Sequence, residues 1–412
     1  MRLPCSGHGT ILNFPNNRIK IGCMLISSRV KNLHPYVPGE QPKDRDYIKL
    51  NANENPYPPS PEVSKALSSF IESSSEKLGL YPDPDSLELH AAIADMLNKT
   101  GGVLSRCSVS SDGSVCPAEE DKIPFTVTPD MIYSGNGSDE VLSFVFYAFF
   151  DSGKSFVMPE FTYSFYPVYA GFYNIPMDTV PLKEDWSLDV KEMLARSKKN
   201  KGGIIFANPN APTGLSLTRE EVRQMLLEAD KDEIFIVDEA YVDFGGQSCI
   251  PLLSEFKNLV IVRTFSKSLC GAGQRLGYIV SSPELVNIVT TVKNSVNHFP
   301  IDVLAQVSGT AACRNPAYYV DCAKKVCSVR DDFYNFLLTK GFYAVESDTN
   351  FIFARHPKIG GADLYQAVKN DGILIRHFNT PGIEDFVRIT VGTQKQMELL
   401  KESFNKITGG LK

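Results

Sequence analysis

Short apolar runs alternate with longer stretches of helical periodicity through the middle of the chain. Runs of three to five mostly apolar residues predict buried strands, and apolar residues that recur every three or four positions predict helices. Such an alternation is typical of an α/β fold in which helices flank a mainly parallel sheet. We expect strands at 131–133, 155–158, 203–207, 234–237, 259–262 and 278–280, with helices at 138–150, 162–171, 187–198, 218–230 and 283–295.

The pattern changes at about residue 317, where long helical stretches are joined by short apolar runs. This change predicts a second, smaller α+β domain. Its expected helices are 317–340, 362–371 and 394–408, and its expected strands are 342–345, 350–355, 373–376 and 386–390. We therefore expect a large domain over 61–300 and a small C-terminal domain over 301–412.

Three segments lie outside this regular pattern. Residues 1–28 carry basic residues but no apolar stretch of signal-peptide length. We therefore expect a disordered extension there and not a targeting peptide. Residues 29–60 include a run rich in Asn and Pro, which predicts an ordered N-terminal arm. Residues 103–123 carry Gly, Ser and Asp with little periodicity, and we expect a peripheral surface insertion there.

Composition narrows the class of protein. The 412 residues are 43% hydrophobic, which is enough for a large core. The net charge of −6 lacks the basic excess that is typical of nucleic-acid-binding proteins. No apolar run approaches the ~20 residues that span a bilayer. The nine cysteines are scattered without the paired spacing of zinc sites, so we expect no metal, reduced thiols and a cytoplasmic protein.

The most informative segment surrounds Lys267. This lysine follows the strand at 259–262, is preceded by Ser266, and is followed by Arg275 in a glycine-rich turn. An amine that can form an imine therefore lies beside groups that suit a phosphate, and pyridoxal 5′-phosphate needs both. The alternative is a solvated surface lysine next to a helix-capping serine.

A carboxylate is expected at the end of a neighbouring strand. Four apolar residues lead into Asp238, and a buried aspartate is costly without a cationic partner. A protonated pyridine nitrogen would be such a partner, and Tyr241 could reach the oxygen on the same ring. Alternatively, Asp238 caps a helix and Tyr241 packs in the core.

Two further turns could contact such a cofactor. In the segment 135–139, glycines precede a helix start at Ser138 and Asp139, which is the form of a phosphate cradle as well as of a capped turn. Tyr163 could stack on the ring. The Pro- and Gly-containing turn 208–214 could aim an amide at a ring oxygen.

Together these segments resemble the fold-type I pyridoxal-phosphate aminotransferases of class I and II, and among them the histidinol-phosphate aminotransferase family. The resemblance runs from about Lys31 to the C-terminus. Besides the four segments above, it rests on His34-Pro35-Tyr36, the segment 50–56, Leu80-Tyr81-Pro82, the segment 349–355 and the segment 387–393.

The resemblance implies a role for each matched residue. Lys267 would carry the cofactor and move protons, Asp238 would hold the ring nitrogen, and Tyr241 the ring oxygen. Tyr163 would stack on the ring. The phosphate would be held by Ser138 and Asp139 through their backbones, together with Ser266, Arg275 and, from the neighbouring subunit, Tyr81. The substrate would be bound by Tyr36, Asn53, Arg376 and Arg388.

The resemblance also implies a homodimer with shared active sites and small-molecule substrates. The expected reaction exchanges an amino group between histidinol phosphate and 2-oxoglutarate, a step of histidine biosynthesis. Alternatives are an aromatic amino acid aminotransferase, a phosphothreonine decarboxylase-like lyase and a ligand sensor without enzymatic activity.

One residue departs from the family pattern. The family has an asparagine directly before Pro-Thr-Gly, and here that position is Ala211. We expect either Asn210 or Asn208 to replace the missing contact with the ring oxygen, or Tyr241 to make it alone.

Overall fold

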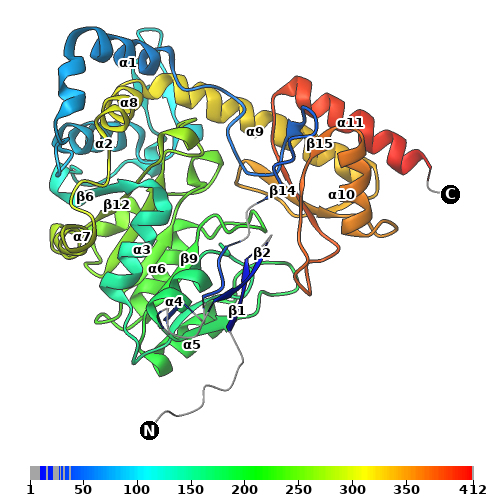
Figure 1. Ribbon diagram of the computed structural model, residues 1–412, viewed down its shortest axis with the longest axis horizontal. Helices are drawn as coiled ribbons and strands as arrows, with labels where there is room; N and C mark the ends of the chain where they lie inside the picture. Colours follow the sequence, from blue (N-terminus) through cyan, green and yellow to red (C-terminus); the bar gives the residue numbers. More distant parts are fainter. Residues whose placement is uncertain are drawn as a thin grey trace.

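The computed structural model of the chain (Figure 1) describes residues 10–14, 17–21, 27, 29–30, 33–36 and 39–410. These residues form two layered parts. The larger part is built on a seven-stranded sheet, and the smaller part, drawn in orange and red, is built on a four-stranded sheet. The expected α/β fold class with a smaller C-terminal domain is confirmed.

The central sheet is mainly parallel. In spatial order the strands are β6 (Ile132–Asn136), β12 (Leu276–Ser281), β11 (Leu259–Thr264), β10 (Phe235–Asp238), β9 (Ile204–Ala207), β7 (Phe156–Pro159) and β8 (Met177–Val180). The last five strands in this order, β11 to β8, pair in parallel, whereas β12 is antiparallel to both of its neighbours. The strand β8 was not expected, because as an edge strand it is partly exposed and mixes polar with apolar residues.

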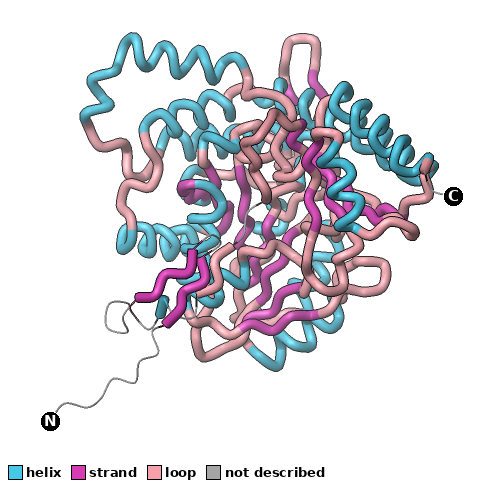
Figure 2. Tube along the Cα trace, turned by 45° about the vertical axis from the view of Figure 1, so that its right-hand side comes forward, coloured by secondary structure: helices cyan, strands magenta, loops and turns pink. Residues whose placement is uncertain are grey.

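The apolar runs are continuous because the sheet is buried on both faces. Phe235 and Val237 of β10 pack into one apolar cluster, and Ile236 between them packs into another on the opposite face. Figure 2 shows the strands side by side with helices outside them. The helices that accompany this sheet are α3 (Gly137–Phe149), α4 (Tyr166–Tyr173), α5 (Val190–Asn200), α6 (Arg219–Glu228) and α7 (Pro283–Val296).

Three more helices pack together at one end of the large domain. They are α1 (Pro61–Ser74), α2 (Leu87–Thr100) and α8 (Val303–Cys313). The helix α8 was not expected, because its buried positions are mostly small residues that give no periodic apolar signal. A Cβ on Gly309 would lie 2.5 Å from Leu276, so this helix approaches the core closely. The chain then leaves the large domain along α9 (Pro316–Thr339), beyond the expected boundary.

The small domain carries an antiparallel sheet and receives the N-terminal arm. In spatial order its strands are β13 (Tyr343–Ala344), β14 (Phe351–Arg355), β17 (Val387–Thr390) and β16 (Arg376–His377), and its helices are α10 (Gly361–Asn370) and α11 (Gln394–Gly409). In the arm, β3 (Ile48–Lys49) pairs in parallel with β15 (Ile373–Leu374). The arm is thereby fixed against the small domain.

The extension over residues 1–28, where we expected disorder, contains ten residues that the structure describes as strand. Strands β1 (Thr10–Phe14) and β2 (Asn17–Ile21) form an antiparallel hairpin. β-branched residues occur in both strands, and such residues favour extended backbone. Apart from Ser27, the rest of that extension lies outside the described residues.

The expectation of a peripheral insertion at 103–123 holds only for its tip. The short strands β4 (Ser108–Val109) and β5 (Val115–Cys116) form a hairpin with an exposed end. At its base, however, Val103 and Asp121 are fully buried, because the chain re-enters the protein there to pack and to form ion pairs. No helix in the described part of the chain is long and apolar enough to cross a membrane.

Candidate active site

A cavity of about 950 Å³ lies where the arm, the central sheet and the small domain meet. Its walls come from segments far apart in the sequence, which the carboxyl ends of the strands bring together. Half of the site residues expected from the sequence line it. These are Tyr36, Asn53, Tyr163, Tyr241, Lys267, Arg376 and Arg388.

Lys267 lies in the turn that follows β11. Its Nζ donates a hydrogen bond of 3.3 Å to the carbonyl of Ala52, and it lies 5.7 Å from the centre of the Tyr241 ring. Its own carbonyl accepts a bond of 2.9 Å from the amide of Asn55. The side chain is therefore half-buried and held on two sides by the arm, which argues against a solvated surface lysine.

Asp238 ends β10 as a buried carboxylate without a nearby cation. One oxygen accepts a hydrogen bond of 2.8 Å from the Tyr166 hydroxyl, and the other accepts one of 3.1 Å from the backbone of Ala240. No lysine, arginine or histidine of the described chain forms an ion pair with it. Burial raises the pKa of this carboxyl to about 6. A positively charged ring nitrogen would supply the missing partner.

Tyr166 was not anticipated from the sequence. It is fully buried, and it packs edge-on against Tyr163 of the cavity wall with ring centres 5.5 Å apart. Through these two rings Asp238 lies directly behind the cavity. Tyr163 precedes α4 and Tyr166 is its first residue, so the sequence offered no periodic signal that would pair the two rings.

The raised pKa of Asp238 predicts a pH-dependent stability in the protein prepared without cofactor. The folded protein binds this proton up to about pH 6, and the unfolded chain releases it near 3.8, so unfolding free energy falls as pH rises between the two values. Asp238→Asn lacks this titration. From pH 4 to pH 7, we expect the stability of the wild type to fall by on the order of 3 kcal/mol relative to the variant. Urea unfolding at several pH values measures this difference, and parallel curves would contradict it.

The arm also orients Tyr241. The Asn53 amide donates a hydrogen bond of 2.9 Å to the phenolic oxygen, which leaves the phenolic hydrogen for another acceptor. Asn53 is buried in a left-handed conformation, with φ of 54°. Its backbone and side chain are fixed by Thr390 and Asn350 of the small domain. Tyr241 is therefore positioned from both domains.

A turn suited to phosphate adjoins the cavity at the start of α3. Gly137 has a φ of 78°, a backbone conformation that favours glycine, and a Cβ there would lie 2.4 Å from the end of the Arg275 side chain. Asp139 pairs with Arg275 at 3.4 Å and accepts a hydrogen bond of 2.7 Å from Tyr163. Unpaired N–H groups at a helix start bind anions. The expected residue Ser138 is the second residue of α3, and Ser266 lies in the segment after β11 that also leads to Arg275.

Two arginines form the opposite wall. Arg376 and Arg388 are paired neighbours on β16 and β17. Burial lowers the pKa of Arg388, and its Nε is buried without a hydrogen-bond partner. Its guanidinium lies 5.2 Å from the centre of the Phe351 ring. A planar guanidinium with an unused donor in a cavity suits a carboxylate or a phosphate.

Asn208 and Asn210, the two residues expected to replace the missing contact with the ring oxygen, do not line the cavity. Asn208 uses both ends of its amide on the backbone of Leu217. Asn210 donates to the carbonyl of Phe161, and its buried oxygen has no partner. Ala211, the residue directly before Pro212, lines the cavity itself. The replacement of the family's asparagine by Asn210 therefore stays a prediction.

The comparisons with known proteins agree with this geometry. Residues 45–404 match the family model of aminotransferase class I and II. The chain is 41% identical over 388 residues to the histidinol-phosphate aminotransferase of Syntrophus aciditrophicus (strain SB), covering 94% of this chain and 99% of the relative.

Solved structures share the fold. One is the histidinol-phosphate aminotransferase of Sinorhizobium meliloti in complex with pyridoxal-5′-phosphate, with a TM-score of 0.73, 22% identity, and coverage of 89% of this chain and 93% of that one. Another is the L-threonine-O-3-phosphate decarboxylase of Porphyromonas gingivalis, with a TM-score of 0.68, 22% identity, and coverage of 88% and 99%. The family match and the relative at 41% identity show that this chain belongs to the class I and II aminotransferases, in the histidinol-phosphate aminotransferase family.

Proposed function

We propose that this protein is a pyridoxal-phosphate-dependent aminotransferase that exchanges an amino group between histidinol phosphate and 2-oxoglutarate in histidine biosynthesis. The relative from Syntrophus aciditrophicus, named for this activity, is 41% identical over nearly its full length. One observation on the structure carries the proposal: a single cavity joins the Lys267 amine to the buried Arg388 guanidinium, and the uncompensated Asp238 carboxylate lies behind its wall.

The residues present fit pyridoxal phosphate. The phosphate would lie at the start of α3, where Gly137 leaves room beside Arg275. The ring nitrogen would meet Asp238, whose carboxylate lacks a cation among the described residues. Bound there, the cofactor supplies an aldehyde that bonds to amines and a protonated ring that withdraws electrons from the substrate.

The chain's own groups then handle protons and position the reactants. Lys267 Nζ, held near Ala52, would remove the proton from the substrate carbon that bears the amino group. Asp238 would stay ionised beside the ring nitrogen and keep it protonated, because the pair stabilises both charges. Tyr241, oriented by Asn53, would donate its phenolic hydrogen to the ring oxygen.

The cavity favours substrates with negative charge. Arg376 and Arg388 lie side by side on its wall, and Lys49 on the rim is paired with Glu54 at 2.8 Å. Histidinol phosphate carries a phosphate, and 2-oxoglutarate carries two carboxylates, so one pair of arginines can serve both half-reactions. Tyr36, which packs against Phe165 at 5.1 Å, would close the cavity over the substrate.

Arg388→Gln tests this assignment. The variant keeps a planar amide of smaller size but loses the charge, and a hydrogen bond to a charged group is worth about 1.5–3 kcal/mol. We expect kcat/KM for histidinol phosphate to fall about 10- to 100-fold, with cofactor binding unchanged. Arg355→Gln is the matched control, since this arginine lies on β14 outside the cavity. Equal losses in the two variants would remove Arg388 from the site.

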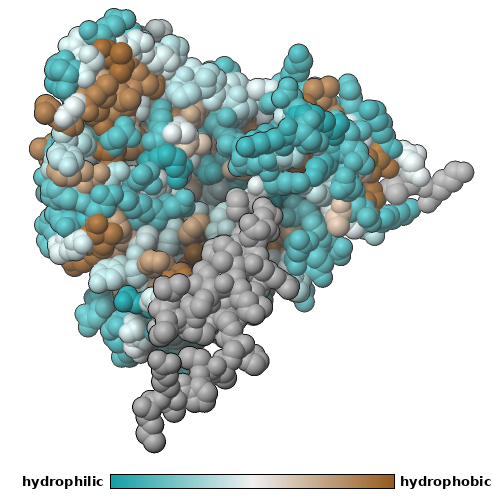
Figure 3. Space-filling model, viewed as in Figure 1, coloured by the Kyte–Doolittle hydropathy of each residue, from teal (hydrophilic) through white to brown (hydrophobic). Residues whose placement is uncertain are grey.

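We further propose a homodimer in the cytoplasm. Tyr81 is 82% exposed and stacks on Phe299, outside the cavity of its own chain, as expected of a residue that serves a neighbouring subunit. Exposed apolar residues lie on α1 and in the segment that follows it, namely Ile71 on the helix and Leu78 and Leu80 after it. Figure 3 shows apolar surface at the end of the molecule where Figure 1 places α1. The described cysteines are free thiols, which fits a reducing compartment.

The choice of substrate is tested by comparing amino donors under one set of conditions. Histidinol phosphate, phenylalanine, tyrosine and phosphothreonine are each supplied with 2-oxoglutarate, and glutamate and carbon dioxide are measured. We expect the highest kcat/KM with histidinol phosphate and no carbon dioxide. A preference for phenylalanine or tyrosine would identify an aromatic aminotransferase, and carbon dioxide from a phosphorylated amino acid would identify a lyase.

A further inference from the structure

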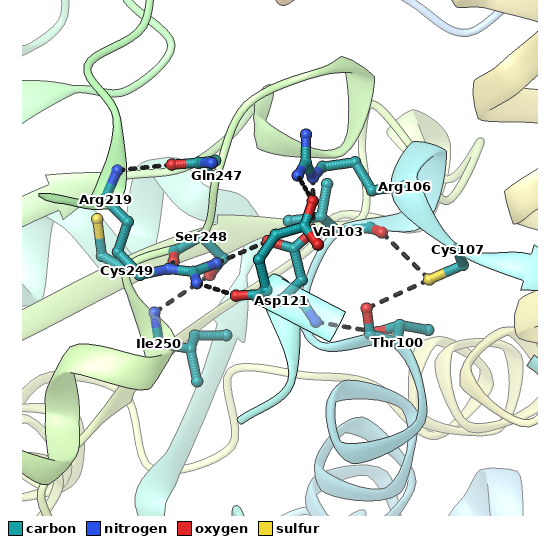
Figure 4. Close-up of polar contacts among 12 residues, drawn as sticks. Thr100, Val103, Arg106, Cys107, Asp121, Arg219, Gln247, Ser248, Cys249 and Ile250 are labelled. Carbon is teal, nitrogen blue, oxygen red and sulfur yellow. Dashed lines mark hydrogen bonds and ion pairs between the residues drawn. The ribbon is translucent and has the colours of Figure 1, made fainter. Parts of the chain in front are cut away.

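The base of the hairpin that carries β4 and β5 is anchored by a buried carboxylate. Asp121 is fully buried, and its two oxygens accept hydrogen bonds from Arg106 at 2.5 Å and from Arg219 at 2.7 Å. Arg219 also donates to the carbonyl of Ser248 at 2.6 Å. Figure 4 shows Asp121 between the two arginines, with Ser248 beside the Arg219 guanidinium. A buried carboxylate needs such partners, so the base of the hairpin has a fixed position.

A second buried ion pair joins Glu239 to Arg263. Glu239 is the residue after Asp238, and its carboxylate accepts bonds of 2.9 Å from Arg263 and 2.9 Å from the Ser248 hydroxyl. Arg263 also donates to the carbonyl of Gly102, where the hairpin segment begins, at 2.7 Å. The ordered hairpin base is thus connected to the strand end that presents Asp238.

Asp243 completes the connection to the lysine. One carboxylate oxygen accepts a hydrogen bond of 2.9 Å from the backbone of Leu104, at the base of the hairpin. The other accepts one of 2.6 Å from the hydroxyl of Ser268, the residue directly after Lys267. Arg263 lies 3.7 Å away, so the carboxylate has a counter-ion. Asp243 and Ser268 are both buried, and neither lines the cavity.

We propose that Asp243 is a positioning residue for Lys267, and that through it the base of the hairpin holds the lysine turn in the geometry that the cofactor requires. This inference rests on the proposed function. A turn that is free to move by a fraction of an ångström would misplace the Lys267 amine, and misplacement of that size lowers both cofactor affinity and rate.

The test compares two buried serines with the cofactor-loaded protein as reference. Ser268→Ala removes the bond to Asp243 without opening the cavity wall. Ser281→Ala is the matched control, because Ser281 is fully buried at the other end of the β11–β12 pair and donates one bond of 2.6 Å to the Leu259 carbonyl. The dissociation constant of pyridoxal phosphate, the visible circular dichroism of the bound cofactor, kcat and melting temperature are measured for each.

We expect Ser268→Ala to raise the dissociation constant about 10-fold and to weaken the circular dichroism band, because a charge-assisted bond that orders the site is lost. Ser281→Ala is expected to lower the melting temperature by about as much as Ser268→Ala does. It should leave the dissociation constant of the cofactor and the circular dichroism band unchanged. Equal cofactor readouts in the two variants would overturn the inference. Wild-type protein that binds no pyridoxal phosphate would instead overturn the proposed function.

Asp243→Asn provides a second approach from the other end of the bond. The amide keeps the shape of the side chain and removes its charge, so the fold is retained even if Ser268→Ala proves unstable. We expect this variant to weaken cofactor binding in the same direction. If both substitutions act through one contact, the double variant is no worse than the weaker-binding single variant, whereas additive losses would contradict the proposal.

Discussion

Lys267→Ala is expected to abolish turnover of histidinol phosphate and the visible absorbance of the protein-bound cofactor. Of the two described lysines that line the cavity, Lys267 has its amine 5.7 Å from the centre of the Tyr241 ring, whereas Lys49 is paired with Glu54. In the proposed mechanism the removal of the Lys267 amine takes away both the covalent attachment point and the group that moves the substrate proton. Absorbance spectra and a coupled glutamate assay on purified variants measure both effects.

Lys267→Arg is the control that separates chemistry from charge. It retains the positive charge near Ala52 but cannot form the covalent bond, so we expect it to be as inactive as the alanine variant. Both variants should keep the wild-type melting temperature to within a few degrees, since the side chain is only half-buried. Normal turnover in either variant would refute the assignment of the catalytic lysine.

Asp238→Asn is expected to lower kcat by about 10²- to 10³-fold. The carboxylate is buried and has only Tyr166 and Ala240 as hydrogen-bond partners among the described residues, so we propose that it balances a charge that the cofactor brings. Removing one partner of a buried ion pair is worth about 3–5 kcal/mol, which corresponds to losses of this size. Single-turnover kinetics with histidinol phosphate measure the effect on the chemical step.

Tyr166→Phe supplies the graded comparison for Asp238. It removes one hydrogen bond of 2.8 Å to the carboxylate and leaves the charge in place. We expect a loss of about 10-fold in kcat, at the lower end of the roughly 1.5–3 kcal/mol for one hydrogen bond to a charged group, because the bond from Ala240 remains. A Tyr166→Phe enzyme as impaired as Asp238→Asn would mean that Asp238 acts through the tyrosine and not through charge balance.

The parts of the site that could be predicted from the sequence are those set by local order. Asp238 and Lys267 follow buried strands, and the carboxyl ends of parallel strands meet at one edge of a sheet. The turn at Gly137 could be read from its glycines and the helix that follows. Arg376 and Arg388, by contrast, came from the resemblance alone, because no periodic pattern reveals that two short strands pair them beside a distant lysine.

What could not be predicted depends on contacts between distant segments. The burial of Asp121 follows from Arg106 and Arg219, which lie 15 and 98 residues away from it. The hydrogen bond from Asn53 to Tyr241 spans 188 residues. Neither contact leaves a local signature, so a segment rich in Gly and Ser resembled a peripheral loop even though its base is part of the core.

The most direct test of the account is to locate the covalently held cofactor and to see whether the substrate releases it. The loaded protein is reduced with borohydride, which fixes the cofactor on the lysine that holds it, and the digested peptides are identified by mass spectrometry. The account predicts a pyridoxyl group on Lys267, and loss of this label when histidinol phosphate is added before reduction. A label on another lysine, or a label on Lys267 that histidinol phosphate leaves unchanged, would contradict it.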